Sequence, residues 1–207
     1  MKRVINLDNW NRKEHFKFFS ALDDPFWGIT TTVDFTSIYQ QSKNMEVSFF
    51  LYSVHFLLKC INATTAFKLR IENGEVVEYD KINISPTIGT FGFGFFEYDT
   101  DLSLFIENAE KEIHRVKNST GLSFSKDTAR ADVIRYSALP WFAFSEMKHA
   151  GSIQTGDSIP KISTGKLIQE KKKLLLPISI SVHHGLVDGR NVAEFIQNVK
   201  DGQNNTL

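Results

Sequence analysis

The chain has 207 residues and a formal net charge of zero, because 24 Lys and Arg balance 24 Asp and Glu. This length suits one large domain, and the balanced charge argues against long-range attraction of nucleic acid. The N-terminus lacks a signal-type apolar segment, and the longest apolar run, 47–61, is interrupted by His55 and Lys59. Cys60 is the only cysteine, so no intramolecular disulfide can form. We expect a single cytoplasmic domain over residues 1–207, with no membrane segment.

Two elements are predicted near the start of the chain. The apolar spacing over residues 12–19 is compatible with a short helix capped by Asp8, Asn9 or Asn11. After a turn, apolar and polar residues alternate over residues 29–35, which is typical of a strand.

The middle of the chain predicts a helix, a hairpin and an unusual glycine-rich strand. Apolar residues recur every three or four positions over residues 47–61, which indicates a helix with one buried face. Asn73 and Gly74 suit the two positive-φ positions of a type I′ hairpin turn. Glycine and phenylalanine alternate over residues 90–96. Either the glycine face of this strand is open, so that a flat or bulky ligand can approach it, or the sheet is packed tightly there.

The second half predicts one helix followed by several strands. Helical spacing over residues 102–116 precedes an apolar run at 133–142. Two further strands are expected, at 161–169 and from 174 to His183, with a charged turn between them. Together with four helical patterns, these strands predict an α/β two-layer sandwich with a large mixed sheet.

The end of the last predicted strand carries the residues best suited to chemistry. His183 and His184 follow the alternating apolar run, Asp188 comes four positions after His184, and Gly189 permits a turn before a final helical pattern. Neutral imidazole can accept a proton from a hydroxyl or thiol at cellular pH. Asp188 could orient His184 directly or hold the shape of the loop. Both histidines could instead be ordinary polar residues or half of a metal site, although no further ligands stand at zinc-binding spacing.

Three separated blocks of sequence stand out together. They are Asn9-Trp10-x-Arg12-x-Glu14-His15-Phe16, Ser137-Ala138-Leu139-Pro140-Trp141 and His183-His184-x-x-Val187-Asp188-Gly189. These blocks resemble one family, the type A chloramphenicol acetyltransferases, and their order and separations agree with that family over nearly the whole chain. The resemblance implies a compact fold of the CoA-dependent acyltransferase type, assembled as a homotrimer with active sites between subunits. It also implies acetyl-CoA as cosubstrate, with no metal.

The resemblance assigns a role to each of four residues. His184 is expected to be the general base that deprotonates an acceptor hydroxyl, which then attacks the thioester of acetyl-CoA. Ser137 is expected to donate a hydrogen bond to the oxyanion. Asp188 is expected to pair with Arg12 and fix the loop. The implied activity is acetylation of chloramphenicol, which inactivates this antibiotic and gives resistance.

The same resemblance outlines a substrate pocket in which several residues depart from the family pattern. Arg135 stands where Asn is usual, Phe19 where Tyr is common, and Met147 and His149 where apolar residues are expected. These departures leave two alternatives open: the same chemistry on another small alcohol, or a weakly active relative that binds a ligand or acyl-CoA. The expected substrate-binding residues are Phe18, Phe19, Phe91, Phe93, Arg135, Trp141, Met147 and Ser163.

Overall fold

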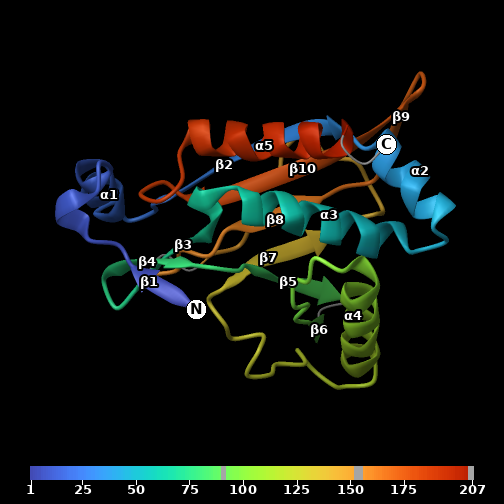
Figure 1. The fold of residues 1–207 in the computed structure, drawn as a ribbon, viewed down its shortest axis with the longest axis horizontal. Coiled ribbons are helices and arrows are strands. Elements are labelled where there is room, and N and C mark those ends of the chain that lie inside the picture. The colour runs from blue at the N-terminus through green and yellow to red at the C-terminus, as the bar shows by residue number, and fades with distance from the viewer. Residues whose placement is uncertain (90–91, 152–155, 205–207) are drawn as a thin grey trace.

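A seven-stranded mixed sheet forms the centre of the computed structural model, which describes residues 1–89, 92–151 and 156–204 (Figure 1). The strand order is β2-β10-β8-β7-β5-β6, and β9 pairs with β10 outside this path. Strands β5, β7 and β8 run parallel, whereas β10 runs antiparallel to both β2 and β8. The predicted large mixed sheet is therefore confirmed. The strands are β2 (Phe26–Asp34), β5 (Asn83–Ile88), β6 (Gly92–Phe93), β7 (Val133–Ala138), β8 (Lys161–Thr164), β9 (Ile168–Glu170) and β10 (Lys173–His183).

Helices cover one face of this sheet and so complete the predicted two-layer arrangement. Helices α3 (Phe49–Ala63) and α5 (Gly189–Asn204) lie side by side across it, and α4 (Leu102–Lys117) packs against β5 and β6 (Figure 1). The shorter helices α1 (Lys13–Ser20) and α2 (Thr36–Asn44) flank the layer. Within the described ranges, no helix has the length and apolar character needed to cross a membrane.

The alternation of β10 gives the sheet two chemically different faces. Ile178, Ile180 and Val182 are fully buried in the core under the helices. Successive side chains of a strand point to opposite faces, so Ser179 and Ser181 lie on the other side of the sheet. The helix-free face is consequently lined with polar groups, and the candidate site is built there.

The predicted hairpin belongs to a second, three-stranded sheet of order β1-β4-β3, formed by β1 (Lys2–Val4), β4 (Glu75–Tyr79) and β3 (Leu69–Glu72). Asn73 and Gly74 join β3 to β4 with φ values of 51° and 82°. Both central residues of the turn therefore have positive φ, as a type I′ turn requires. The Asn-Gly prediction is confirmed.

Several predicted boundaries were wrong. Helix α1 is capped by Arg12, whose side chain makes no capping hydrogen bond, rather than by Asp8, Asn9 or Asn11. The predicted strand 161–169 is split into β8 and β9. Helix α2 was not predicted, because its mostly polar sequence has only one fully buried apolar side chain, that of Ile38.

The glycines near β6 serve tight packing. A Cβ atom on Gly92 would overlap Val116 of α4, and one on Gly94 would overlap Ile88 at the end of β5. Of the two interpretations of the Gly-Phe alternation, close packing is the one found, and the open glycine face was wrong for these two positions. Phe91 lies outside the described residues.

Arg70 joins the small sheet to the large one from a fully buried position. Its guanidinium donates hydrogen bonds to the carbonyl oxygens of Phe67, Leu69, Ala131 and Val133, at 2.6 to 2.9 Å. Burial lowers its pKa to about 10, so the group still carries its charge at neutral pH. The start of β7 is thereby tied to the segment that leads into β3.

Replacing Arg70 with Met should destabilise the fold by about 3 kcal/mol, because buried carbonyl groups would lose their donor. The measurement is urea denaturation at pH 7. Arg3→Met is the matched control, since Arg3 is exposed and its surface pair with Glu78 should contribute little to stability. Equal losses in the two variants would contradict a structural role for the buried guanidinium.

Candidate active site

His184 occupies the turn that follows β10, and its backbone is fixed from two sides. Its N–H donates to the carbonyl oxygen of Pro25 at 2.8 Å. Its own carbonyl oxygen lies 2.7 Å from Nε2 of His15 on α1, so the protonated Nε2 of His15 donates this bond. The position of His184 thus depends on α1 and on the approach to β2.

Aromatic side chains hold the imidazole ring of His184. The ring stacks on Phe19, with 3.8 Å between centroids and 20° between planes, and lies 5.3 Å from the ring of Trp27. Its Nδ1 is buried and has no hydrogen-bond partner among the described residues. The half-buried ring therefore offers Nε2 as the nitrogen that can reach a substrate.

Arg12 and Asp188 form the predicted ion pair, with Nη1 and Oδ2 2.6 Å apart. The other carboxylate oxygen accepts the backbone N–H groups of Arg190 and Asn191, at the first turn of α5. Burial would raise the pKa of Asp188, but the hydrogen bonds and charge of Arg12 and the helix N–H groups bring it below its ordinary value. Of the two alternatives left open, Asp188 holds the loop, since its bonds go to Arg12 and α5 and none goes to His184.

His183 is a buried structural histidine. Its Nδ1 accepts the N–H of Gly185 at 3.1 Å, and its side chain is only 4% exposed. Burial lowers its pKa to about 4. The neutral ring of His183 therefore shapes the turn that presents its neighbour.

Ser137 lies away from His184, in a row of hydroxyl groups that crosses the face of the sheet not covered by helices. Strand register places Thr30 beside Ser179, Ser179 beside Ser163, and Ser163 beside Ser137. The row continues to Thr87, whose Oγ1 is 3.3 Å from Oγ of Ser137. Five adjacent strands thus present hydroxyl groups at one level.

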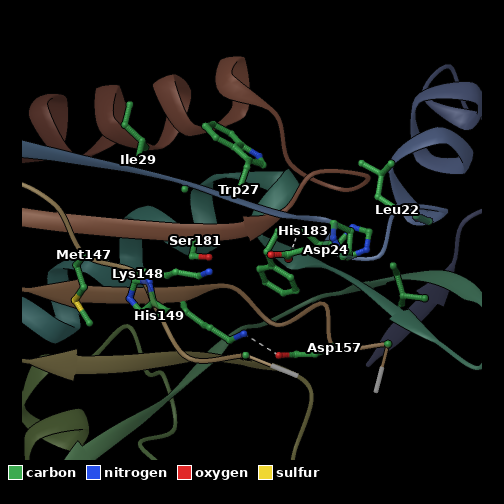
Figure 2. Close-up of a pocket in the computed structure, with 18 of the residues that line it drawn as sticks. Leu22, Asp24, Trp27, Ile29, Met147, Lys148, His149, Asp157, Ser181 and His183 are labelled. Atoms are coloured by element: carbon green, nitrogen blue, oxygen red, sulfur yellow. Dashed lines mark hydrogen bonds and ion pairs between the residues drawn. The ribbon is translucent and has the colours of Figure 1, made fainter. Parts of the chain in front are cut away.

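Five of the predicted site residues line a cavity of about 360 Å³ beside this row. A larger cavity of about 1090 Å³ extends toward α1 and β2, and the two share Met147, His149 and Lys161. Figure 2 shows Met147, His149, Ser181 and His183 among the side chains around the larger cavity. The shared residues join the two cavities over the polar face of the sheet. The predicted residues in the smaller cavity are Phe93, Arg135, Ser137, Met147 and Ser163.

His184 and Ser137 are well separated within one chain. Ser179 lies two strands from Ser137 at the same level, and His183 is four residues further along β10. With rises near 3.3 Å per residue and strand spacings near 4.8 Å, that is about 13 Å along and about 10 Å across the sheet. One chain therefore does not bring the imidazole and this hydroxyl to one reacting atom.

The remaining predicted residues are at the surface. Phe18 is 65% exposed beside Phe19, and Trp141 is 70% exposed and lines neither of the two cavities. The sequence reasoning missed His15 and Trp27, which contact His184 directly. His15 belongs to the first of the three blocks that resemble the family, so its place in that block could have identified it as a site residue.

Within the described residues, no group of three or more His, Cys, Asp or Glu is arranged to hold a metal ion. The single cysteine, Cys60, is buried in the core, and burial raises the pKa of its thiol to about 12. Its place is in the apolar packing between α3 and α5.

Comparison with known proteins gives one family. A family model described as chloramphenicol acetyltransferase matches residues 2–200. Chloramphenicol acetyltransferase 3 of Escherichia coli is 27% identical, covering 98% of this chain and 97% of the relative. A chloramphenicol acetyltransferase of Staphylococcus aureus is also 27% identical, covering 95% of this chain and 93% of the relative.

Solved structures share the fold. A chloramphenicol acetyltransferase superposes with a TM-score of 0.90 at 30% identity, covering 98% of this chain and 99% of that one. A probable dihydrolipoamide acetyltransferase from Listeria monocytogenes gives a TM-score of 0.68 at 13% identity, covering 98% and 94%. The second likeness shows that the fold is shared with other acyltransferases, as the sequence predicted.

Asp188→Asn should lower stability at pH 7 by about 2 kcal/mol, because the charge that pairs with Arg12 is lost while an acceptor oxygen for α5 remains. Asp188→Ala should lose about 1 kcal/mol more, since the helix cap disappears too. Because the folded pKa of Asp188 is depressed, its contribution is present above the unfolded value and is lost as the pH falls. Urea midpoints measured at pH 7 and pH 3 should therefore show a deficit for the Asn variant that shrinks in acid. A deficit independent of pH would contradict the ion-pair assignment.

Proposed function

The chain belongs to the chloramphenicol acetyltransferase family, and from this premise we propose that it acetylates a hydroxyl group of chloramphenicol with acetyl-CoA. The observation that carries the proposal is the family match over residues 2–200, and the half-buried imidazole of His184, which stacks on Phe19, supports it. Acetylation would inactivate the antibiotic and give resistance. The enzyme would act in the cytoplasm, where acetyl-CoA is available.

In the proposed reaction, His184 is the general base. Its Nε2 takes the proton of the acceptor hydroxyl as the oxygen attacks the thioester carbonyl of acetyl-CoA. The tetrahedral intermediate then collapses, the C–S bond breaks, and the CoA thiolate leaves with the proton that His184 returns. The acetyl group passes directly to the acceptor. Because Phe19 stacks on the imidazole and Trp27 lies beside it, the lone pair is directed without help from a carboxylate.

Ser137 is the proposed oxyanion donor. Its Oγ would stabilise the negative charge of the tetrahedral intermediate by a hydrogen bond, and Thr87, at 3.3 Å, orients this hydroxyl. Arg12 and Asp188 act as positioning residues, because their bonds fix the loop and α5 and they do not contact the reacting atoms.

We further propose a homotrimer with each active site between subunits. The wide separation of His184 and Ser137 within one chain supports this arrangement, because a neighbouring subunit can supply the missing partner. The proposed substrate-binding residues are Phe18, Phe19, Phe91, Phe93, Arg135, Trp141, Met147 and Ser163.

A second acceptor class is favoured by the character of the smaller cavity. Arg135 and His149 line it, and a different alcohol with a polar or charged group could bond to these side chains. The same transfer to another small alcohol therefore stands beside chloramphenicol as a candidate activity.

The first test is release of free CoA from acetyl-CoA in the presence of chloramphenicol. His184→Ala should lower the rate by about 10²- to 10⁴-fold, the usual contribution of a general base. His114→Ala is the matched control, because His114 is exposed on α4. Full activity in the His184→Ala protein would overturn the assigned mechanism, and no acceptor-dependent release from the folded wild type would overturn the proposed activity.

The shared site predicts complementation between two inactive variants. Co-expressed His184→Ala and Ser137→Ala chains should form mixed trimers in which about one quarter of the sites combine an intact histidine with an intact serine. CoA release by the purified mixture should then exceed that of either parent, and sedimentation should give a trimer. A mixture no more active than its parents, or an active monomer, would refute sites between subunits.

A further inference from the structure

The cavity beside Ser137 carries an uncompensated positive charge. Lys161 and Arg135 both line it. Lys161 pairs with Asp157, with Nζ and Oδ2 3.0 Å apart. Arg135 has no ion pair within the described residues, although it is only partly exposed. Partial burial of an unpaired cation is unfavourable, so a ligand that brings an anion there would be favoured.

The guanidinium of Arg135 is already positioned by the protein. Its Nη1 donates to Oγ of Ser85 at 3.2 Å and to the carbonyl oxygen of Thr128 at 2.8 Å. Its Nε and Nη2 make no hydrogen bond in the described part of the chain and are not enclosed there. These two donors form the edge that binds a carboxylate in a bidentate manner.

The spacing between Arg135 and Ser137 specifies where the anion would lie. Both residues are on β7 and point to the same face of the sheet, about 7 Å apart along the strand. If the reacting hydroxyl oxygen of an alcohol lies near Ser137, a second group on that alcohol, at a similar distance from the hydroxyl, would lie beside the guanidinium of Arg135.

The rest of the lining adds hydrogen-bonding groups and little further charge. His149 contacts Oγ of Ser163 at 3.0 Å, and burial, together with the charge of Lys161, lowers its pKa. Its ring is therefore favoured in the neutral form. Phe93 and Met147 provide an apolar wall for the body of the ligand.

We propose that this cavity selects primary alcohols that carry a carboxylate at this distance from the reacting hydroxyl, and that Arg135 determines this specificity. The inference rests on the proposed acetyl transfer, because Ser137 marks the reacting position. Chloramphenicol is then accepted as a neutral substrate that leaves the guanidinium unpaired.

The test compares two acceptors of the same shape, 4-(hydroxymethyl)benzoate and 4-(hydroxymethyl)benzamide. With the wild-type enzyme, kcat/KM for CoA release should be about 10- to 100-fold higher for the carboxylate, the range expected for a charge-assisted hydrogen-bonded pair. Arg135→Gln should abolish the preference, and Arg135→Lys should retain part of it. Arg3→Gln is the matched control, because Arg3 is exposed on β1, in the other sheet. Thermal melting identifies any variant that fails to fold. If Arg135→Gln does not fold, Arg135→Lys is compared with the wild type instead.

A binding measurement separates this inference from the proposed reaction. NMR titration of both probes into the folded His184→Ala protein reports affinity without turnover. Equal affinity and equal kcat/KM for the two probes would overturn the charge selection while acetyl transfer could stand. Preferential binding of the carboxylate, lost in the double variant with Arg135→Gln, would support the selection even if no acceptor were acetylated. Binding of neither probe would overturn it.

Discussion

The double pairing of β10 is the constraint on which the rest of the structure depends. Its register with β2 and β8 directs Ile178, Ile180 and Val182 toward the helices. The same register directs Ser179 and Ser181 to the opposite face. A shift of one residue would exchange these sets, burying hydroxyl groups in the core and exposing the apolar ones. Burial of these apolar side chains therefore fixes the register of β10. That register in turn determines which hydroxyl groups line the polar face and where His184 lies after the strand ends.

The histidine at that point is held mainly by backbone contacts and ring packing. Pro25 and His15 bond the two backbone groups of His184, and Phe19 stacks on its ring. The ion pair of Arg12 and Asp188 belongs to the same assembly, because it joins α1 to the start of α5 around the loop. Segments remote in sequence thus meet at one turn, and movement of any of them would displace the imidazole.

Local sequence patterns predicted those helices, strands and turns whose formation depends on residues close together in the sequence. Alternation predicted β10, helical spacing predicted α3 and α4, and Asn73 with Gly74 predicted the hairpin turn. Contacts between residues far apart in the sequence could not be predicted from such local patterns. The close approach of Val116 to Gly92, which decided between the two interpretations of the glycines, depends on how α4 packs on β6. The pairing of Arg12 with Asp188 was expected only through the family resemblance, and the hydroxyl row became visible only from strand register.

The separation between the proposed base, His184, and the proposed alcohol pocket would let one reaction serve different acceptors. The residues that hold His184 come from α1, the approach to β2 and the turn after β10, whereas Arg135, Phe93 and Ser163 line the cavity on β6, β7 and β8. Neither Phe19 nor His15 lines that cavity. A charged residue can therefore replace a neutral one beside Ser137 without changing the contacts of the imidazole. Because the proposed general base, His184, and the proposed pocket for the alcohol are fixed by different elements, the proposed chemistry can be kept while the selected alcohol changes.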